Sequence, residues 1–167
     1  MTENKNIQLS PAIRERINQW ILRYPPEQKR SGVFEALRLA QEENDGSLTV
    51  PLMDAVADYL DMPKIAVYEI ATFYTMYYLN PVGRHVIQLC TNISCMLNGS
   101  EKILKHLKKR LGIDVNETTV DGQFTLKEVE CLGACIAPPV CQIGKCYYEN
   151  LTPEKIDRLL QELHDGK

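Results

Sequence analysis

Residues 124–135 carry the sequence Phe124-Thr125-Leu126-Lys127-Glu128-Val129-Glu130-Cys131-Leu132-Gly133-Ala134-Cys135. Apolar and polar side chains alternate through most of residues 124–130, which predicts a β-strand that delivers Cys131 at its end. Cys131 and Cys135 then share a short loop, where the rigid strand can hold thiolates while the loop wraps around a metal. Gly133 and Ala134 are small, so the loop backbone can approach the metal and point its amides at the sulfur atoms.

A second cysteine pair follows a second predicted strand. Residues 85–89 read as a buried strand that runs directly into Cys90, with Cys95 beyond it. Four thiolates satisfy either one tetrahedral zinc ion or one 2Fe-2S cluster, so their number does not decide the metal. The spacing favours the cluster, because structural zinc sites prefer Cys-x2-Cys whereas Cys-x4-Cys occurs in plant-type ferredoxins. A zinc-stabilised interaction module is the alternative of a different class.

The two remaining cysteines allow another ligand set. Cys141 and Cys146 complete a run of four cysteines within residues 131–146, which could in principle hold a cluster by itself. Both lie in short predicted strands, where a cysteine is usually a small apolar side chain. We therefore interpret these two residues as packing residues. The Cys-x-x-Cys spacing of thiol–disulfide enzymes is absent.

The net charge, the apolar stretches and the amino-terminal residues limit the partners and the cellular compartment that we expect for this chain. The net charge of −3 gives no broad attraction to nucleic acid or to an anionic membrane. The longest apolar stretch, residues 65–79, contains Glu69 and is shorter than the about 20 apolar residues that a spanning helix needs, so we expect no direct membrane insertion. The amino terminus lacks the apolar core of a signal peptide, which predicts a cytoplasmic protein with reduced cysteines.

The chain divides at the breaker cluster of residues 80–83, Asn80-Pro81-Val82-Gly83. Before it, proline and serine signals and apolar stripes predict helices near residues 11–24, 31–43, 51–60 and 63–77. After it, we expect strands at residues 85–89, 124–130, 139–143 and 146–149, a helix capped by Ser100 and ended by Gly112, and a last helix capped by Thr152. The predicted fold class is α+β: a helical docking domain over residues 1–80 and a thioredoxin-like domain over residues 81–167.

The cysteine loops and the sequence around them resemble a known family. The resemblance is carried by Cys90-x4-Cys95 with Leu97-x-Gly99-Ser100, by residues 129–135, and by Pro139, Gln142-Ile143, Tyr147-Tyr148-Glu149-x-Leu151-Thr152 and residues 69–74. Together these residues resemble the thioredoxin-like 2Fe-2S subunit of the NADH dehydrogenase module of respiratory complex I. Such subunits form one family of NADH:quinone oxidoreductase chains. Residues 91–94, Thr91-Asn92-Ile93-Ser94, depart from the threonine and proline content that is more usual there.

The resemblance implies a 2Fe-2S ferredoxin domain with one cluster on Cys90, Cys95, Cys131 and Cys135, and no catalytic residue on this chain. It also implies a partner subunit that binds FMN and NADH, further complex I subunits, and a peripheral place on the cytoplasmic side of the inner membrane. The sequence has no glycine-rich phosphate loop, so this chain is not expected to hold either nucleotide. We expect a subunit that exchanges single electrons with the partner's FMN. NAD-reducing hydrogenases and NAD-dependent formate dehydrogenases, which use similar subunits, are the alternative hosts.

Overall fold

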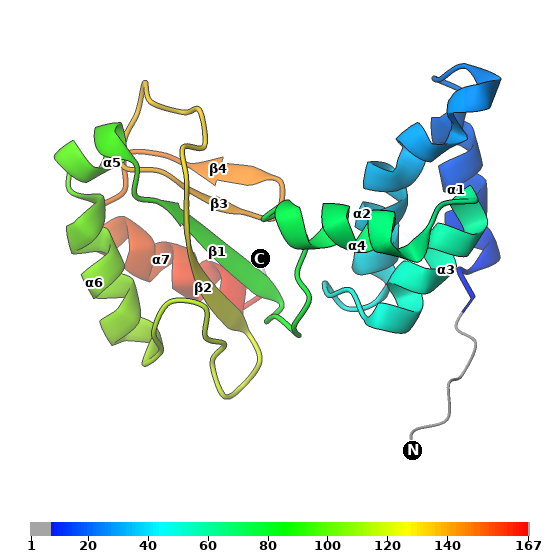
Figure 1. Ribbon diagram of the computed structural model, residues 1–167. Coiled ribbons are helices and arrows are strands. Elements are labelled where there is room, and N and C mark those ends of the chain that lie inside the picture. The colour runs from blue at the N-terminus through cyan, green and yellow to red at the C-terminus, as the bar shows by residue number, and fades with distance from the viewer. Residues whose placement is uncertain (1–7, 167) are drawn as a thin grey trace. The chain divides into compact units, whose positions relative to one another are not determined.

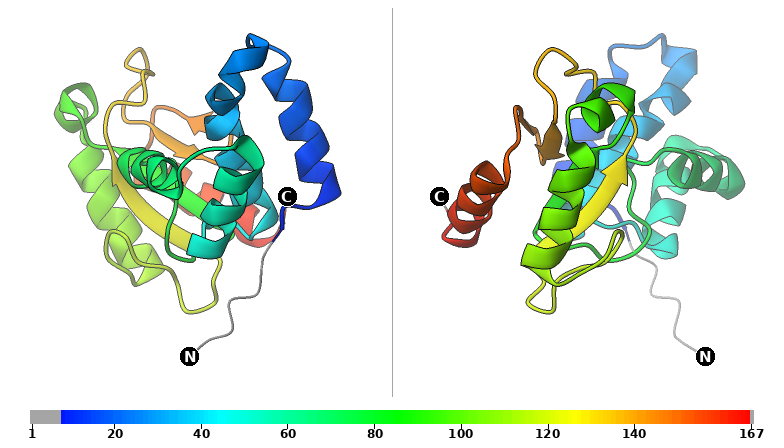
Figure 2. Two further views of the ribbon diagram at one scale, coloured as in Figure 1. Left: turned by 45° about the vertical axis from the view of Figure 1, so that its right-hand side comes forward. Right: turned by 90° about the vertical axis from the view of Figure 1, so that its left-hand side faces the viewer.

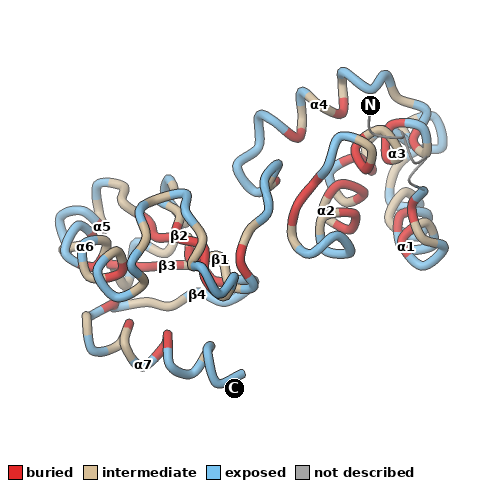
Figure 3. Tube along the Cα trace, turned by 90° about the horizontal axis from the view of Figure 1, so that it is seen from below, coloured by how far each residue is buried: buried red, intermediate tan, exposed pale blue. Residues whose placement is uncertain are grey.

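The computed structural model describes residues 8–166 and divides into two compact units, Met1–Pro81 and Val82–Lys167. Figure 3 shows buried residues in both units. One cluster of buried apolar side chains is formed only by residues of the first unit, and the two other clusters only by residues of the second. Each unit therefore has its own apolar core.

The first unit is built from helices (Figure 1). They are α1 (Pro11–Ile21), the 3-10 helix η1 (Pro26–Gly32), α2 (Val33–Glu43), α3 (Val50–Leu60) and α4 (Lys64–Phe73). Ile17, Leu37 and Val56 are fully buried where α1, α2 and α3 turn their apolar faces inward. These elements agree with the predicted helical bundle.

The prediction for the last helix of this unit was partly wrong, because α4 ends at Phe73 rather than near Tyr77. Tyr74 has an extended backbone with ψ 122°. The segment that follows is bound to α2 instead: the Gln41 carboxamide donates to the Met76 carbonyl at 3.1 Å and accepts from the Tyr78 amide at 2.7 Å. Tertiary hydrogen bonds thus replace the helical ones in this segment.

The second unit contains a mixed four-stranded sheet with two long helices. Its elements are β1 (His85–Cys90), α5 (Ile93–Leu97), α6 (Ser100–Leu111), β2 (Phe124–Val129), β3 (Cys141–Ile143), β4 (Cys146–Tyr148) and α7 (Pro153–His164). The strand order is β2-β1-β3-β4, with β1 and β2 parallel and the other two pairs antiparallel. Helices α6 and α7 contact each other and share a core with Ile87 and Leu89 of β1, so both lie on one face of the sheet (Figure 2).

The ends of α6 confirm one capping prediction and correct another. Gly112 ends the helix in the left-handed region at φ 69°, as expected. Ser100 is the first helical residue rather than the cap, because Gly99 occupies the cap position at φ 89°. The Ser100 hydroxyl is buried and has no hydrogen-bond partner among the described residues. Glycine takes the cap position here because the chain enters the helix through a left-handed conformation.

The start of α7 follows the predicted signal, which leads to a test of stability. Thr152 accepts a hydrogen bond from the Lys155 amide at 3.2 Å. We expect Thr152→Ala to lower the free energy of unfolding of the second unit by about 1 kcal/mol. The measurement is urea unfolding followed by circular dichroism. Thr49→Ala is the matched control, because exposed Thr49 precedes α3 without a side-chain capping bond, and a loss of equal size there would contradict the assignment.

Candidate metal centre

The structure brings the four predicted ligand cysteines to one cavity of about 430 Å³ in the second unit. The cavity is lined by Cys90, Asn92, Ile93, Ser94, Cys95, Leu97, Asn98, Cys131 and Cys135. Strands β1 and β2 run parallel, and Cys90 is in register with Val129. Both cysteine loops therefore leave the sheet at the same end, because the carboxyl ends of parallel strands lie side by side.

The first pair lies in apolar surroundings. Cys90 closes β1, where its amide donates to the Val140 carbonyl at 3.0 Å. Asn92 then caps α5 by accepting from the Ile93 amide at 2.9 Å, and the short helix turns Cys95 back toward Cys90. Both thiols are buried and pack with Val140 in a small apolar cluster. The protein core thus holds this half of the site.

The second pair lies at the surface. The sulfur atoms of Cys131 and Cys135 are 3.6 Å apart, and both residues are exposed. Gly133 has φ 78°, a conformation that favours glycine, and its amide donates to the Cys131 sulfur at 3.4 Å. The Tyr147 hydroxyl donates to the Leu132 carbonyl at 3.1 Å and so holds the loop to β4. This half of the site faces solvent, on a loop that a hydrogen bond from Tyr147 ties to β4.

The protonation of the thiols follows from these surroundings. Burial in the first place, and the hydrogen bond with Cys90 in the second, raise the pKa of Cys95 to about 11. The hydrogen bond with Cys131 raises the pKa of Cys135, and a hydrogen bond from the Ser94 hydroxyl opposes this shift. Without a metal, Cys95 therefore holds its proton at neutral pH. Because metals bind thiolates, loading of the site must release protons.

Cys141 and Cys146 do not line the cavity. Cys141 belongs to the core cluster beneath α6 and α7, and burial raises its pKa to about 12. Cys146 is exposed on β4. Cys141 is packed among apolar side chains, as interpreted from the sequence, whereas Cys146 is not.

The donor set fits a 2Fe-2S cluster. Four thiols surround one cavity, which matches the ligand number of such a cluster, and the Gly133 amide aimed at Cys131 suits an anionic group. Between residues 8 and 166, no three His, Cys, Asp or Glu side chains converge on a single ion position. The four thiols are instead arranged as two pairs.

Sequence reasoning missed the element that positions Cys95. Helix α5 spans only Ile93–Leu97, which is too short for an apolar period to appear in the sequence. The available signal was Asn92, since asparagine is among the favoured N-cap residues. The hydrogen bonds that join Asn92 to Glu130 and Tyr147 to Leu132 left no pattern in the sequence.

Comparison with known proteins identifies the family. The model of the thioredoxin-like [2Fe-2S] ferredoxin family matches residues 17–164. The chain belongs to this family. Members of this 2Fe-2S ferredoxin family hold the cluster that its name describes, and the predicted α+β fold class with a thioredoxin-like domain is confirmed.

Relatives of this ferredoxin-family chain extend over nearly its whole length. It is 47% identical over 163 residues to the E subunit of the NADH-quinone oxidoreductase of Rickettsia bellii, covering 98% of this chain and 93% of that protein. It is 48% identical over 149 residues to an E subunit of the NADH-quinone oxidoreductase of Rhizobium meliloti, covering 89% and 87%. A solved NAD+-reducing [NiFe]-hydrogenase in the H2-reduced state aligns with a TM-score of 0.69 at 19% identity, over 80% of this chain and only 22% of that chain. That likeness shows the shared fold.

Proposed function

We propose that this chain is the 2Fe-2S electron-transfer subunit of an NADH-quinone oxidoreductase, with one cluster on Cys90, Cys95, Cys131 and Cys135. The observation that carries the proposal is the single cavity lined by all four cysteines in a chain of the 2Fe-2S ferredoxin family. The host is supported by relatives at 44–48% identity that are named as E subunits of this oxidoreductase.

The chemistry of the site supports electron transfer. When bound, a 2Fe-2S cluster takes up and gives back one electron. The chain's own residues bind and orient it: Cys90 and Cys95 anchor it to the core, and the Gly133 amide favours the added negative charge at the sulfur of Cys131. Cys131 and Cys135 are exposed, so a redox partner can approach this side closely.

The surroundings of the exposed pair support docking of a protein partner. Ile93, Leu97 and Ile136 are all exposed beside the ligand loops, and Ile136 is 94% exposed. Exposed apolar side chains that gather around a functional site are typical of interaction surfaces. The partner proposed here is the subunit that holds FMN and NADH, since this sequence has no phosphate loop of its own. The chain then contributes to the enzyme as a subunit without a complete active site.

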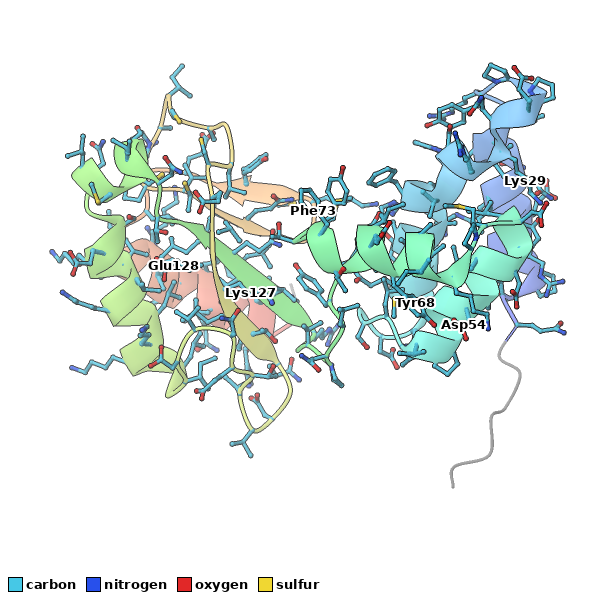
Figure 4. The ribbon with its side chains drawn as sticks, viewed as in Figure 1. Lys29, Asp54, Tyr68, Phe73, Lys127 and Glu128 are labelled. Carbon is cyan, nitrogen blue, oxygen red and sulfur yellow. The ribbon has the colours of Figure 1, made fainter. Side chains whose placement is uncertain are left out.

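The first unit supports a second contact with the same partner. Phe73 lies at the end of α4 (Figure 4) and is 77% exposed. Its ring meets that of Tyr74 at a centroid distance of 5.1 Å. Tyr74 in turn meets Phe34 at 4.9 Å. Tyr77 differs from these residues because it is buried and donates to the Phe34 carbonyl at 2.9 Å. The exposed aromatic patch is therefore Phe34, Phe73 and Tyr74.

The proposed position in the cell is peripheral, on the cytoplasmic side of the inner membrane, reached through the other subunits of the complex. None of the helices within residues 8–166 has the length and apolar character to cross a bilayer. Membrane association of this chain would therefore rest on its partners.

Metal analysis and electron paramagnetic resonance test the proposal. Chain purified without oxygen is expected to contain about two irons and two sulfides and to give one 2Fe-2S signal only after reduction, because the oxidised cluster is diamagnetic. A red-brown colour accompanies this result. Stoichiometric zinc in a colourless protein would overturn the proposal in favour of a zinc-stabilised module.

A further inference from the structure

The two ligand loops are joined by the sheet only up to their first residues. Strands β1 and β2 pair as far as Cys90 and Val129, and the Thr91 amide still donates to the Val129 carbonyl at 3.3 Å. Beyond this point one chain segment turns into α5 and the other into the Cys131–Cys135 loop. The separation of the two thiol pairs therefore depends on contacts made outside the sheet.

The Asn92 side chain uses both of its polar atoms outside the sheet, one within the first ligand loop and one across to the second. The Asn92 carboxamide oxygen accepts from the Ile93 amide at 2.9 Å, which fixes the start of α5. Its nitrogen donates to a Glu130 carboxylate oxygen at 2.8 Å. Glu130 directly precedes Cys131, so this bond joins the first ligand loop to the second immediately before its first sulfur ligand.

We infer that Asn92 is a positioning residue that fixes the separation of the two ligand loops and thereby the retention and reduction potential of the cluster. This inference rests on the proposed function. Ser94 also reaches across to the second loop, but it contacts the Cys135 sulfur itself. The Asn92–Glu130 bond involves no sulfur ligand, so neither of its groups has to give up the bond in order to coordinate the metal.

The chemistry of the pair explains why an amide is needed. An amide nitrogen donates to a carboxylate in a charge-assisted hydrogen bond, which is stronger than a neutral one. Aspartate at position 92 could still cap α5 but would set a second carboxylate against Glu130. The competing interpretation is an ordinary exposed contact, which contributes little to stability.

Reversal of the pair separates these interpretations. In the full chain with its cluster, Asn92→Asp is expected to lose visible cluster absorbance to an iron chelator about tenfold faster than the unaltered chain. Combining Asn92→Asp with Glu130→Gln lets glutamine donate to aspartate and restores the native local charge. We expect the double variant to return to within about threefold of the native rate, with a midpoint potential close to the native value.

Two further variants separate loss of the hydrogen bond from the effect of added charge. Asn92→Ser keeps a capping oxygen, adds no charge and cannot supply the amide donor, so cluster loss about fivefold faster than native and a changed midpoint potential are expected. Gln161→Glu is the matched control, since the Gln161 carboxamide also donates to an exposed carboxylate, that of Asp165, at 3.0 Å. Its cluster is expected to behave as native, because α7 lies outside the cavity lining.

The inference is overturned if Asn92→Asp and Asn92→Ser behave like Gln161→Glu, or if the reversed pair loses its cluster as fast as Asn92→Asp alone. Either result would leave the proposed function intact, because the unaltered chain would still hold a normal cluster. An unaltered chain without iron and sulfide would overturn both.

Discussion

Replacing Cys131 by serine in the full chain is expected to lower bound iron and sulfide to below about one tenth of the native content. The same loss is expected for Cys135→Ser. Each residue lines the cavity, and the sulfur atoms of the two lie 3.6 Å apart on one loop. A serine hydroxyl is a poorer ligand than a thiolate, and neither Cys141 nor Cys146 lines the cavity. Iron analysis and the visible absorption spectrum measure the outcome.

The matched controls are the cysteines outside the cavity. Cys146→Ser is expected to be silent because its thiol is exposed on β4. Cys141→Ser is expected to keep the cluster spectrum while lowering the free energy of unfolding by about 1 kcal/mol, because a hydroxyl replaces a thiol in the apolar core. Loss of the cluster in Cys141→Ser, with Cys131→Ser unaffected, would show that the proposed set of four ligands is wrong.

The order of elements could be predicted because it depends on local signals. Gly112 ends α6 and Thr152 caps α7 as the sequence indicated, since each signal acts within one helical turn. The end of α4 could not be predicted in this way. It depends on two hydrogen bonds of Gln41, more than thirty residues away: its carboxamide donates to the Met76 carbonyl and accepts from the Tyr78 amide. Such contacts leave no periodic pattern in the sequence.

The candidate site also combines features that local sequence signals predict with features that depend on tertiary contacts. Cysteine pairs at two predicted strand ends indicated a metal site, and the parallel pairing of β1 with β2 brings those ends together. The sequence could not show that Cys90 and Cys95 are buried while Cys131 and Cys135 are exposed. That difference depends on α5, whose five residues are too few for periodicity, and on packing against Val140. The link from Asn92 to Glu130 appears only after the loops are placed in space.

A fragment that begins at Val82 and ends at Lys167 is expected to fold and to assemble the cluster. All residues of the second unit's core and all four cavity cysteines lie within it. The same fragment is expected to bind the flavin-carrying partner at least about a hundredfold more weakly than the full chain. The affinity falls because the fragment lacks the exposed aromatic patch of Phe34, Phe73 and Tyr74. Aromatic residues that become buried at the centre of an interface often contribute about 2 kcal/mol each to binding. Isothermal titration calorimetry with the purified partner measures both affinities.

A single substitution separates docking from mere coverage of the second unit. Phe73→Ala in the full chain removes a side chain that is 77% exposed, so it should leave folding intact and weaken partner binding by about tenfold or more. Leu22→Ala is the matched control, because Leu22 is 84% exposed on the same unit but lies outside the aromatic patch. If helices α1–α4 only cover the second unit, the fragment will fail to hold iron and Phe73→Ala will bind the partner as Leu22→Ala does. If they dock the partner, the fragment keeps its iron and loses its affinity, because cluster assembly and partner binding then depend on different units of the same chain.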